Sequence, residues 1–154
     1  MTESLSYVAT IAYLPAKFFA YAGVARYGIG AFLPSSSSPW RRATVVAAIR
    51  VLLGLAMALP LLAAGEWLQN QSWNLGQVAF VLLAYALFYL PLRWLAWSLV
   101  APIVNPEVRS VKAVALCAGF ADAQWRGLGV LASCSIDLIL VVVTGTVPIG
   151  KFFC

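Results

Sequence analysis

Long apolar runs separated by short polar segments dominate the pattern of this chain. Three runs contain about 20 mainly apolar residues, the length that a helix needs to cross a bilayer: residues 43–64, 75–99 and 127–149. Each run carries one charged residue, Arg50, Arg93 or Asp137 respectively. Short connections favour antiparallel neighbours, so we expect a bundle of helices joined by short loops.

The N-terminal segment, residues 4–32, predicts an amphipathic helix. One side of that helix carries a polar stripe, made of Glu3, Ser6, Thr10, Tyr13, Lys17 and Tyr21. The helix either lies flat in the membrane interface or crosses the bilayer with its stripe turned into the bundle. Its length and the small residues Ala12, Ala16 and Ala20 favour the crossing. A cleavable signal peptide is a weaker alternative, because Lys17 interrupts the apolar run.

Residues 111–125 form a shorter segment that precedes the third apolar run. One continuous helix over residues 111–148 would measure about 57 Å, which is far longer than a single crossing. We therefore expect residues 111–125 to form a short interfacial helix or half-helix, with a break near Gln124–Gly129. Asp122 and Arg126 lie four residues apart and are expected to pair on one helical face.

Composition places the chain among integral membrane proteins. Apolar residues make up 63% of the sequence and charged residues only 10%, and the mean hydropathy is +0.92. A water-soluble globule of this size needs roughly a quarter of its residues charged. The sequence thus predicts an all-α integral membrane protein with three or four transmembrane helices in a single membrane domain.

The six tryptophans lie near the ends of the predicted spans: Trp40, Trp67, Trp73, Trp94, Trp97 and Trp125. An indole ring favours the headgroup region of a bilayer, where its apolar body is buried and its N–H group stays hydrated. We therefore expect these residues to form belts at the two membrane surfaces.

Basic residues predict the orientation of the bundle. The formal charge is +5, and the loops at 34–42 and 105–112 carry Arg41, Arg42, Arg109 and Lys112. Positive residues concentrate on the cytoplasmic side, so both loops are expected there, in a bacterial-type plasma (inner) membrane. In so apolar a chain the surplus favours anionic lipid headgroups, and not nucleic acid, as the partner.

Charges inside the predicted spans are the candidate functional residues, since an ionised group at membrane depth is costly unless it is paired or hydrated. Asp137 shares a helical face with Arg126, Ser133 and Thr144. Arg50 and Arg93 are expected at a similar depth, and Tyr85, Tyr89 and Trp97 share the face of Arg93. Three alternatives follow: a buried ion pair that fixes helix register, a pocket for an anionic headgroup or ligand at Arg50 and Arg93, and an ion-translocation site at Asp137.

One short stretch resembles a known membrane domain. Trp125-Arg126 followed by Ile136-Asp137-Leu138 is similar to the start of the RDD domain, which has an arginine at a helix start and an Ile-Asp pair near its middle. The spacing between arginine and aspartate is longer here. The resemblance keeps ion transport among the alternatives.

The sequence favours a non-enzymatic function. It contains no histidine, and no paired carboxylates or activated nucleophile are apparent, so neither catalysis nor a metal or other cofactor is expected. The cysteines, Cys117, Cys134 and Cys154, have no metal-ligand spacing and are expected to be free thiols. We expect an accessory or scaffolding subunit that binds anionic lipid and packs with other membrane subunits or with copies of itself. An oligomeric ion- or proton-coupled transporter or channel that uses Asp137 is the alternative, and a lipid-modifying enzyme is third.

Overall fold

The structure is a computed structural model that describes the backbone of residues 2–69, 75–108 and 110–144. Side chains are described for 11–56, 87, 89–108, 110–114, 116–139 and 142. Five helices form in these ranges: α1 (Thr2–Phe32), α2 (Pro39–Gln69), α3 (Leu75–Val104), α4 (Val111–Leu116) and α5 (Phe120–Thr144). Every regular element of the described backbone is an α-helix, so the all-helical prediction is confirmed.

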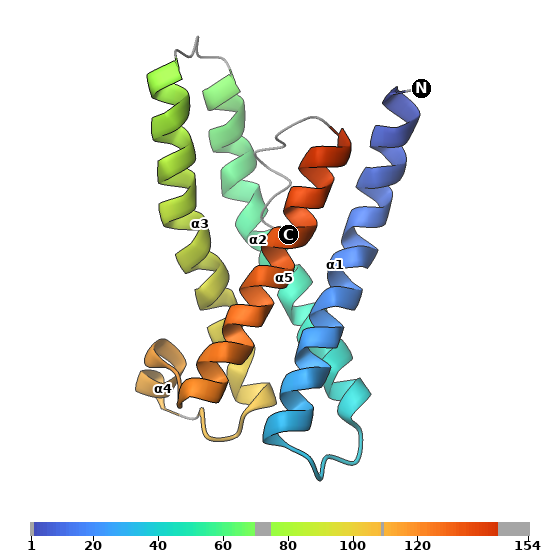
Figure 1. The fold of residues 1–154 in the computed structure, drawn as a ribbon, viewed down its shortest axis with the longest axis vertical. Coiled ribbons are helices and arrows are strands. Elements are labelled where there is room, and N and C mark those ends of the chain that lie inside the picture. Colours follow the sequence, from blue (N-terminus) through green and yellow to red (C-terminus); the bar gives the residue numbers. More distant parts are fainter. Residues whose placement is uncertain (1, 70–74, 109, 145–154) are drawn as a thin grey trace.

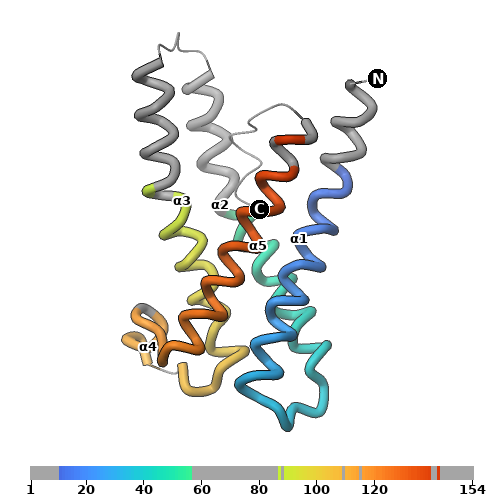
Figure 2. The backbone as a smooth tube through the Cα atoms, in the orientation of Figure 1, coloured from blue at the N-terminus to red at the C-terminus, as the bar shows by residue number. Residues whose placement is uncertain are grey.

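The long helices α1, α2, α3 and α5 run up and down, and the short α4 lies at one end of the bundle (Figure 1). The α1–α2 turn and the α3–α4 connection lie at that same end, and the N-terminus lies at the other. Helix α1 packs against α2 and α5, and α3 packs against the same two helices. Figure 2 follows this path along the backbone.

In the part of the chain that the structure describes, no helix is both long and apolar enough to cross a membrane.

The break before the last long helix lies earlier than the sequence predicts. The chain leaves α4 at Cys117, which has a φ of 70°, and turns into α5 through Gly119, with a φ of 156°. Ser110 starts α4 by accepting a hydrogen bond from the Ala113 amide at 3.1 Å. The expected break near Gln124–Gly129 is wrong, because residues 120–144 form one uninterrupted helix. Residues 145–149 of the predicted third span lie outside the described residues.

Aromatic rings fill the core where α1, α3 and α5 meet. Trp97 stacks edge to face on Tyr21 and on Trp125, with ring centroids 5.5 Å and 5.4 Å apart. The indole N–H of Trp125 donates to the Val24 carbonyl at 2.9 Å. Trp97 and Trp125 are fully buried, so the prediction of an interfacial belt is wrong for these two, whereas Trp40 is 63% exposed. Trp67 and Trp73 lie outside the described side chains.

Candidate functional site

The site is centred on the buried carboxylate of Asp137, in the second half of α5. Its Oδ1 atom lies 2.7 Å from the Lys17 ammonium of α1 and accepts a 2.5 Å hydrogen bond from the Tyr13 hydroxyl. Its Oδ2 atom pairs with the Arg93 guanidinium of α3 at 2.7 Å and accepts a hydrogen bond from the Tyr89 hydroxyl. One carboxylate thus holds three helices together.

The α1 contribution comes from the polar stripe that the sequence reveals. Tyr13, Lys17 and Tyr21 are spaced four residues apart, so helical geometry places them on one face. All three are buried, and Lys17 and Tyr21 have no exposed surface. Of the two orientations open from the sequence, this described part of the stripe has the one turned into the bundle.

Asp137 has no acceptor site left over in this arrangement. An ionised carboxylate offers about four lone-pair positions, and four donors from Tyr13, Lys17, Tyr89 and Arg93 converge on Asp137. Arg93 also donates to the Tyr21 hydroxyl at 3.0 Å, and Ser133 donates to the same oxygen at 3.1 Å. The carboxylate is therefore fully engaged by the protein itself.

Arg50 of α2 lies in the same layer but does not pair with Asp137. Its guanidinium carbon is 5.1 Å from the centroids of both the Tyr21 and the Trp97 rings. The side chain is 1% exposed, and its Nε and Nη2 atoms make no hydrogen bond to any residue that the structure describes. The cation–π contacts with these two rings therefore stabilise this buried cation.

The charges of this layer do not balance. Lys17, Arg50 and Arg93 are buried around one carboxylate, Asp137. Of the other acidic residues of α1 and α2, Glu3 lies about 21 Å along the helix from Lys17 and Glu66 about 24 Å along the helix from Arg50. An anion that compensates Arg50 would have to come from outside these helices.

A second buried pair, Asp122 with Arg126, holds α4 against α5. The two side chains lie four residues apart on α5 and pair at 2.5 Å, as the spacing predicts. Arg126 also donates to the carbonyls of Ala113 and Val114 at 3.0 Å and 2.5 Å and to the Ser98 hydroxyl at 2.8 Å. The arginine thus caps the carbonyl end of α4, which makes this pair a structural clamp.

Most of the residues singled out from the sequence meet in these two networks. Arg93, Tyr89, Ser133 and Asp137 belong to the first and Asp122 and Arg126 to the second. Arg50 joins the first layer only through aromatic rings. The Tyr85 side chain lies outside the described residues.

Lys17 and its two neighbouring tyrosines are the site residues missing from the predicted set. The signal was present in the stripe of α1, but pairing it with Asp137 required the packing of α1 on α5. Among the described residues, no three Cys, Asp or Glu side chains lie close enough together to hold a metal ion.

No known protein family, curated protein or solved structure matches this chain. The resemblance to the RDD domain is thus not supported at the level of the family.

Proposed function

We propose that this chain is a non-catalytic membrane subunit, which packs with other subunits or with copies of itself and retains anionic lipid. The observation that carries the proposal is the reversed distribution of charged and apolar side chains. Six charged residues are buried among the described side chains: Lys17, Arg50, Arg93, Asp122, Arg126 and Asp137.

The outer surface of the described helices is correspondingly apolar. More than half of the surface of each of Leu52, Leu131, Leu138 and Ile139 is exposed. In water, charged side chains stay outside and large apolar patches are rare on a monomer. In lipid, ionisable groups face the bundle interior, where they pair with each other. The distribution supports a lipid environment for the long helices.

The saturated environment of Asp137 favours packing over transport. A translocation site must bind and release an ion or a proton, so its carboxylate needs an accessible lone pair. Asp137 is 3% exposed, and its donors come from two other helices and bind both oxygens. A buried network of this kind fixes the register of α1, α3 and α5.

The outer face of α1 supplies a surface on which another helix can pack. Ala12 and Ala16 are exposed and Ala20 is half-buried, so these three small residues are not fully covered by the rest of the described chain. Small residues at four-residue spacing allow close approach between helices in a membrane. Of the two arginines predicted to bind an anionic group, Arg93 is paired with Asp137. Arg50 therefore remains as the candidate to bind such a group.

Membrane association and assembly are tested separately. Tagged protein expressed in bacteria should stay in the membrane pellet after an alkaline carbonate wash, and mild detergent should release it as an assembly larger than a monomer. The Ala16→Leu variant should reduce the assembled fraction, because the leucine blocks close helix approach, and should leave membrane retention intact.

The matched control is Ala56→Leu, since Ala56 is an exposed alanine on another helix. Equal assembly of the Ala16→Leu and Ala56→Leu variants would argue against α1 as the packing face. Release of the wild-type chain by carbonate would overturn the membrane location.

A further inference from the structure

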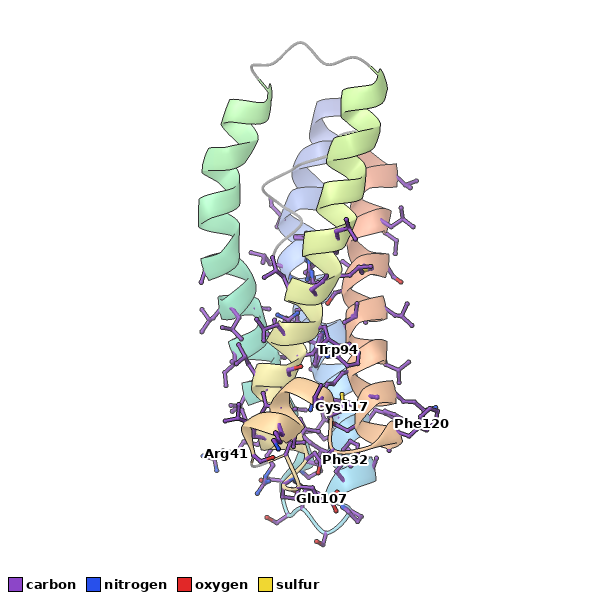
Figure 3. All side chains as sticks on the ribbon, turned by 90° about the vertical axis from the view of Figure 1, so that its left-hand side faces the viewer. Phe32, Arg41, Trp94, Glu107, Cys117 and Phe120 are labelled. Atoms are coloured by element: carbon purple, nitrogen blue, oxygen red, sulfur yellow. The ribbon has the colours of Figure 1, made fainter. Side chains whose placement is uncertain are left out.

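The end of the bundle that carries the α1–α2 turn is strongly basic. Arg26, Arg41, Arg42 and Lys112 lie at this end, and none of them forms an ion pair with a described side chain. Figure 3 shows Arg41 and Glu107 at this end. Glu107 is the one acidic residue described in the connections here. Four cations against one carboxylate leave a surplus that attracts anions.

A shallow surface hollow of about 550 Å³, wide open to the surroundings, lies beside these cations between α1 and the first turn of α2. The residues that line it are Gly23, Arg26, Tyr27, Gly30, Ala31 and Trp40. Arg41 and Arg42 line a second hollow of about 280 Å³ together with Ser38, Val45 and Ile103. Neither hollow overlaps the Asp137 network.

The lining of the larger hollow is apolar along α1 and charged at Arg26. The helix surface is open at the exposed Gly23, since a Cβ there would meet no atom within 4 Å. Tyr27 and Trp40 expose 64% and 63% of their surfaces and are its aromatic lining residues. The Arg26 guanidinium lies over Gly30 and 5.9 Å from the centre of the Trp40 ring. A ligand that fits this lining has an apolar chain joined to an anionic group.

We infer that this hollow binds an acidic phospholipid, with its phosphate at Arg26 and an acyl chain along Gly23 and Tyr27. The inference rests on the proposed membrane location and adds the lipid class and the binding residues. Arg41 and Arg42, on the first turn of α2, contribute further positive charge to the headgroup. The exposed Trp40 ring suits the level of the headgroups, where tryptophan accumulates.

The test uses full-length protein in a neutral detergent, with binding followed by native mass spectrometry. Phosphatidylglycerol, phosphatidylcholine and inorganic phosphate are titrated separately. We expect phosphatidylglycerol to bind at least about fivefold more tightly than phosphatidylcholine, and phosphate to bind far more weakly than phosphatidylglycerol. Equal affinities for the two lipids, or for phosphate and phosphatidylglycerol, would overturn the inference.

Two pairs of variants separate the contribution of charge to lipid binding from that of the apolar lining of the hollow. Arg26→Gln should weaken the binding of phosphatidylglycerol about fivefold. Lys112→Gln, which also removes one positive charge but lies outside the hollow, should change that binding little. Gly23→Leu should fill the hollow and weaken the binding of phosphatidylglycerol without changing the binding of phosphate. The control is Gly127→Leu, because a Cβ at Gly127 also meets no atom within 4 Å.

Equal effects of the two variants within either pair would place the lipid elsewhere. If a helix from another subunit occupied the hollow instead, the Gly23→Leu variant alone would lose assembly, and its lipid binding would be unchanged. Because lipid binding is measured in detergent, its result does not depend on whether the chain stays in the membrane after the carbonate wash. A chain released by carbonate that still selects phosphatidylglycerol would refute the membrane location but keep the lipid site.

Discussion

Asp137 is the residue on which the interior of the bundle depends. It is the one carboxylate described in a layer with three buried cations, and both of its oxygens bind donors. A buried charge is tolerated when it is paired, whereas removal of one partner leaves the others uncompensated in a medium that solvates them poorly. The carboxylate therefore matters more to stability than any one of the cations around it.

We expect Asp137→Asn to lower the free energy of unfolding by about 3–5 kcal/mol, because Lys17 and Arg93 lose their counter-charge. Thermal unfolding of the purified protein measures the loss. Asp137→Asn combined with Arg93→Gln should recover part of it, since one uncompensated cation is removed. Arg42→Gln, at an exposed position, is the control and should change stability by less than about 0.5 kcal/mol. Normal stability of the Asp137→Asn protein would refute the structural role and favour ion transport.

Cys117 is a residue in a strained conformation. Its φ of 70° and ψ of 153° lie in a region that suits glycine. Burial raises the pKa of its thiol, so the side chain is neutral at pH 7 and its removal changes no charge.

Cys117→Gly should raise the free energy of unfolding by about 1 kcal/mol, because glycine adopts this conformation without a steric penalty. Thermal unfolding again measures the change. Cys117→Ala removes the thiol but keeps the Cβ, so it should give no such gain. A stabilisation of the alanine variant as large as that of the glycine variant would show that the thiol, and not the backbone, is responsible.

At the scale of the elements, indole rings and glycines determine how closely the helices approach. A Cβ at Gly28 of α1 would lie 2.3 Å from the Trp125 ring, and one at Gly129 of α5 would lie 2.3 Å from the Trp97 ring. Each glycine thus admits a large ring from another helix, which explains how two tryptophans fit inside so small a bundle.

Gly129→Ala should therefore destabilise the protein by about 1–3 kcal/mol, because the new methyl group forces Trp97 or the backbone to move. Gly127→Ala is the matched control on the same helix, where a Cβ meets no neighbour. It should be neutral or stabilising by up to about 1 kcal/mol, since alanine favours the helix. Urea or thermal unfolding of the two variants gives the comparison, and equal effects would mean that the ring contact contributes nothing.

For the whole molecule, the up-and-down topology brings the two basic connections to one end. The α1–α2 turn and the α3–α4 connection lie together, opposite the N-terminus (Figure 1). If the bundle spans a bilayer, the surplus of arginine and lysine at this end places it in the cytoplasm.

Single-cysteine labelling of intact cells tests that orientation, in a background without native cysteines. A cysteine at Ser36 should be protected from an impermeant maleimide and one at Ser72 should react, although Ser72 lies outside the described residues. Permeabilised cells supply the control, since both positions should then be labelled. Labelling of Ser36 in intact cells without labelling of Ser72 would invert the topology.

Most of the helices, and the chemistry that they carry, could be predicted from the amino-acid pattern alone. Apolar runs with single charges predicted α2 and α3, the stripe of Tyr13, Lys17 and Tyr21 predicted one polar face of α1, and the spacing of Asp122 and Arg126 predicted their pair. These features are local, because helical geometry alone fixes which residues share a face.

Which helical faces meet could not be predicted from the amino-acid pattern. Lys17 and Asp137 lie 120 positions apart in the sequence, and nothing in either helix shows that the ammonium of one reaches the carboxylate of the other, while Arg50 is left among aromatic rings. Burial of Trp97 and Trp125 likewise depends on glycines of other helices, so a local rule that places tryptophan at helix ends could not reveal it. Such partnerships arise from the packing of distant segments and from the charge and volume that each one brings.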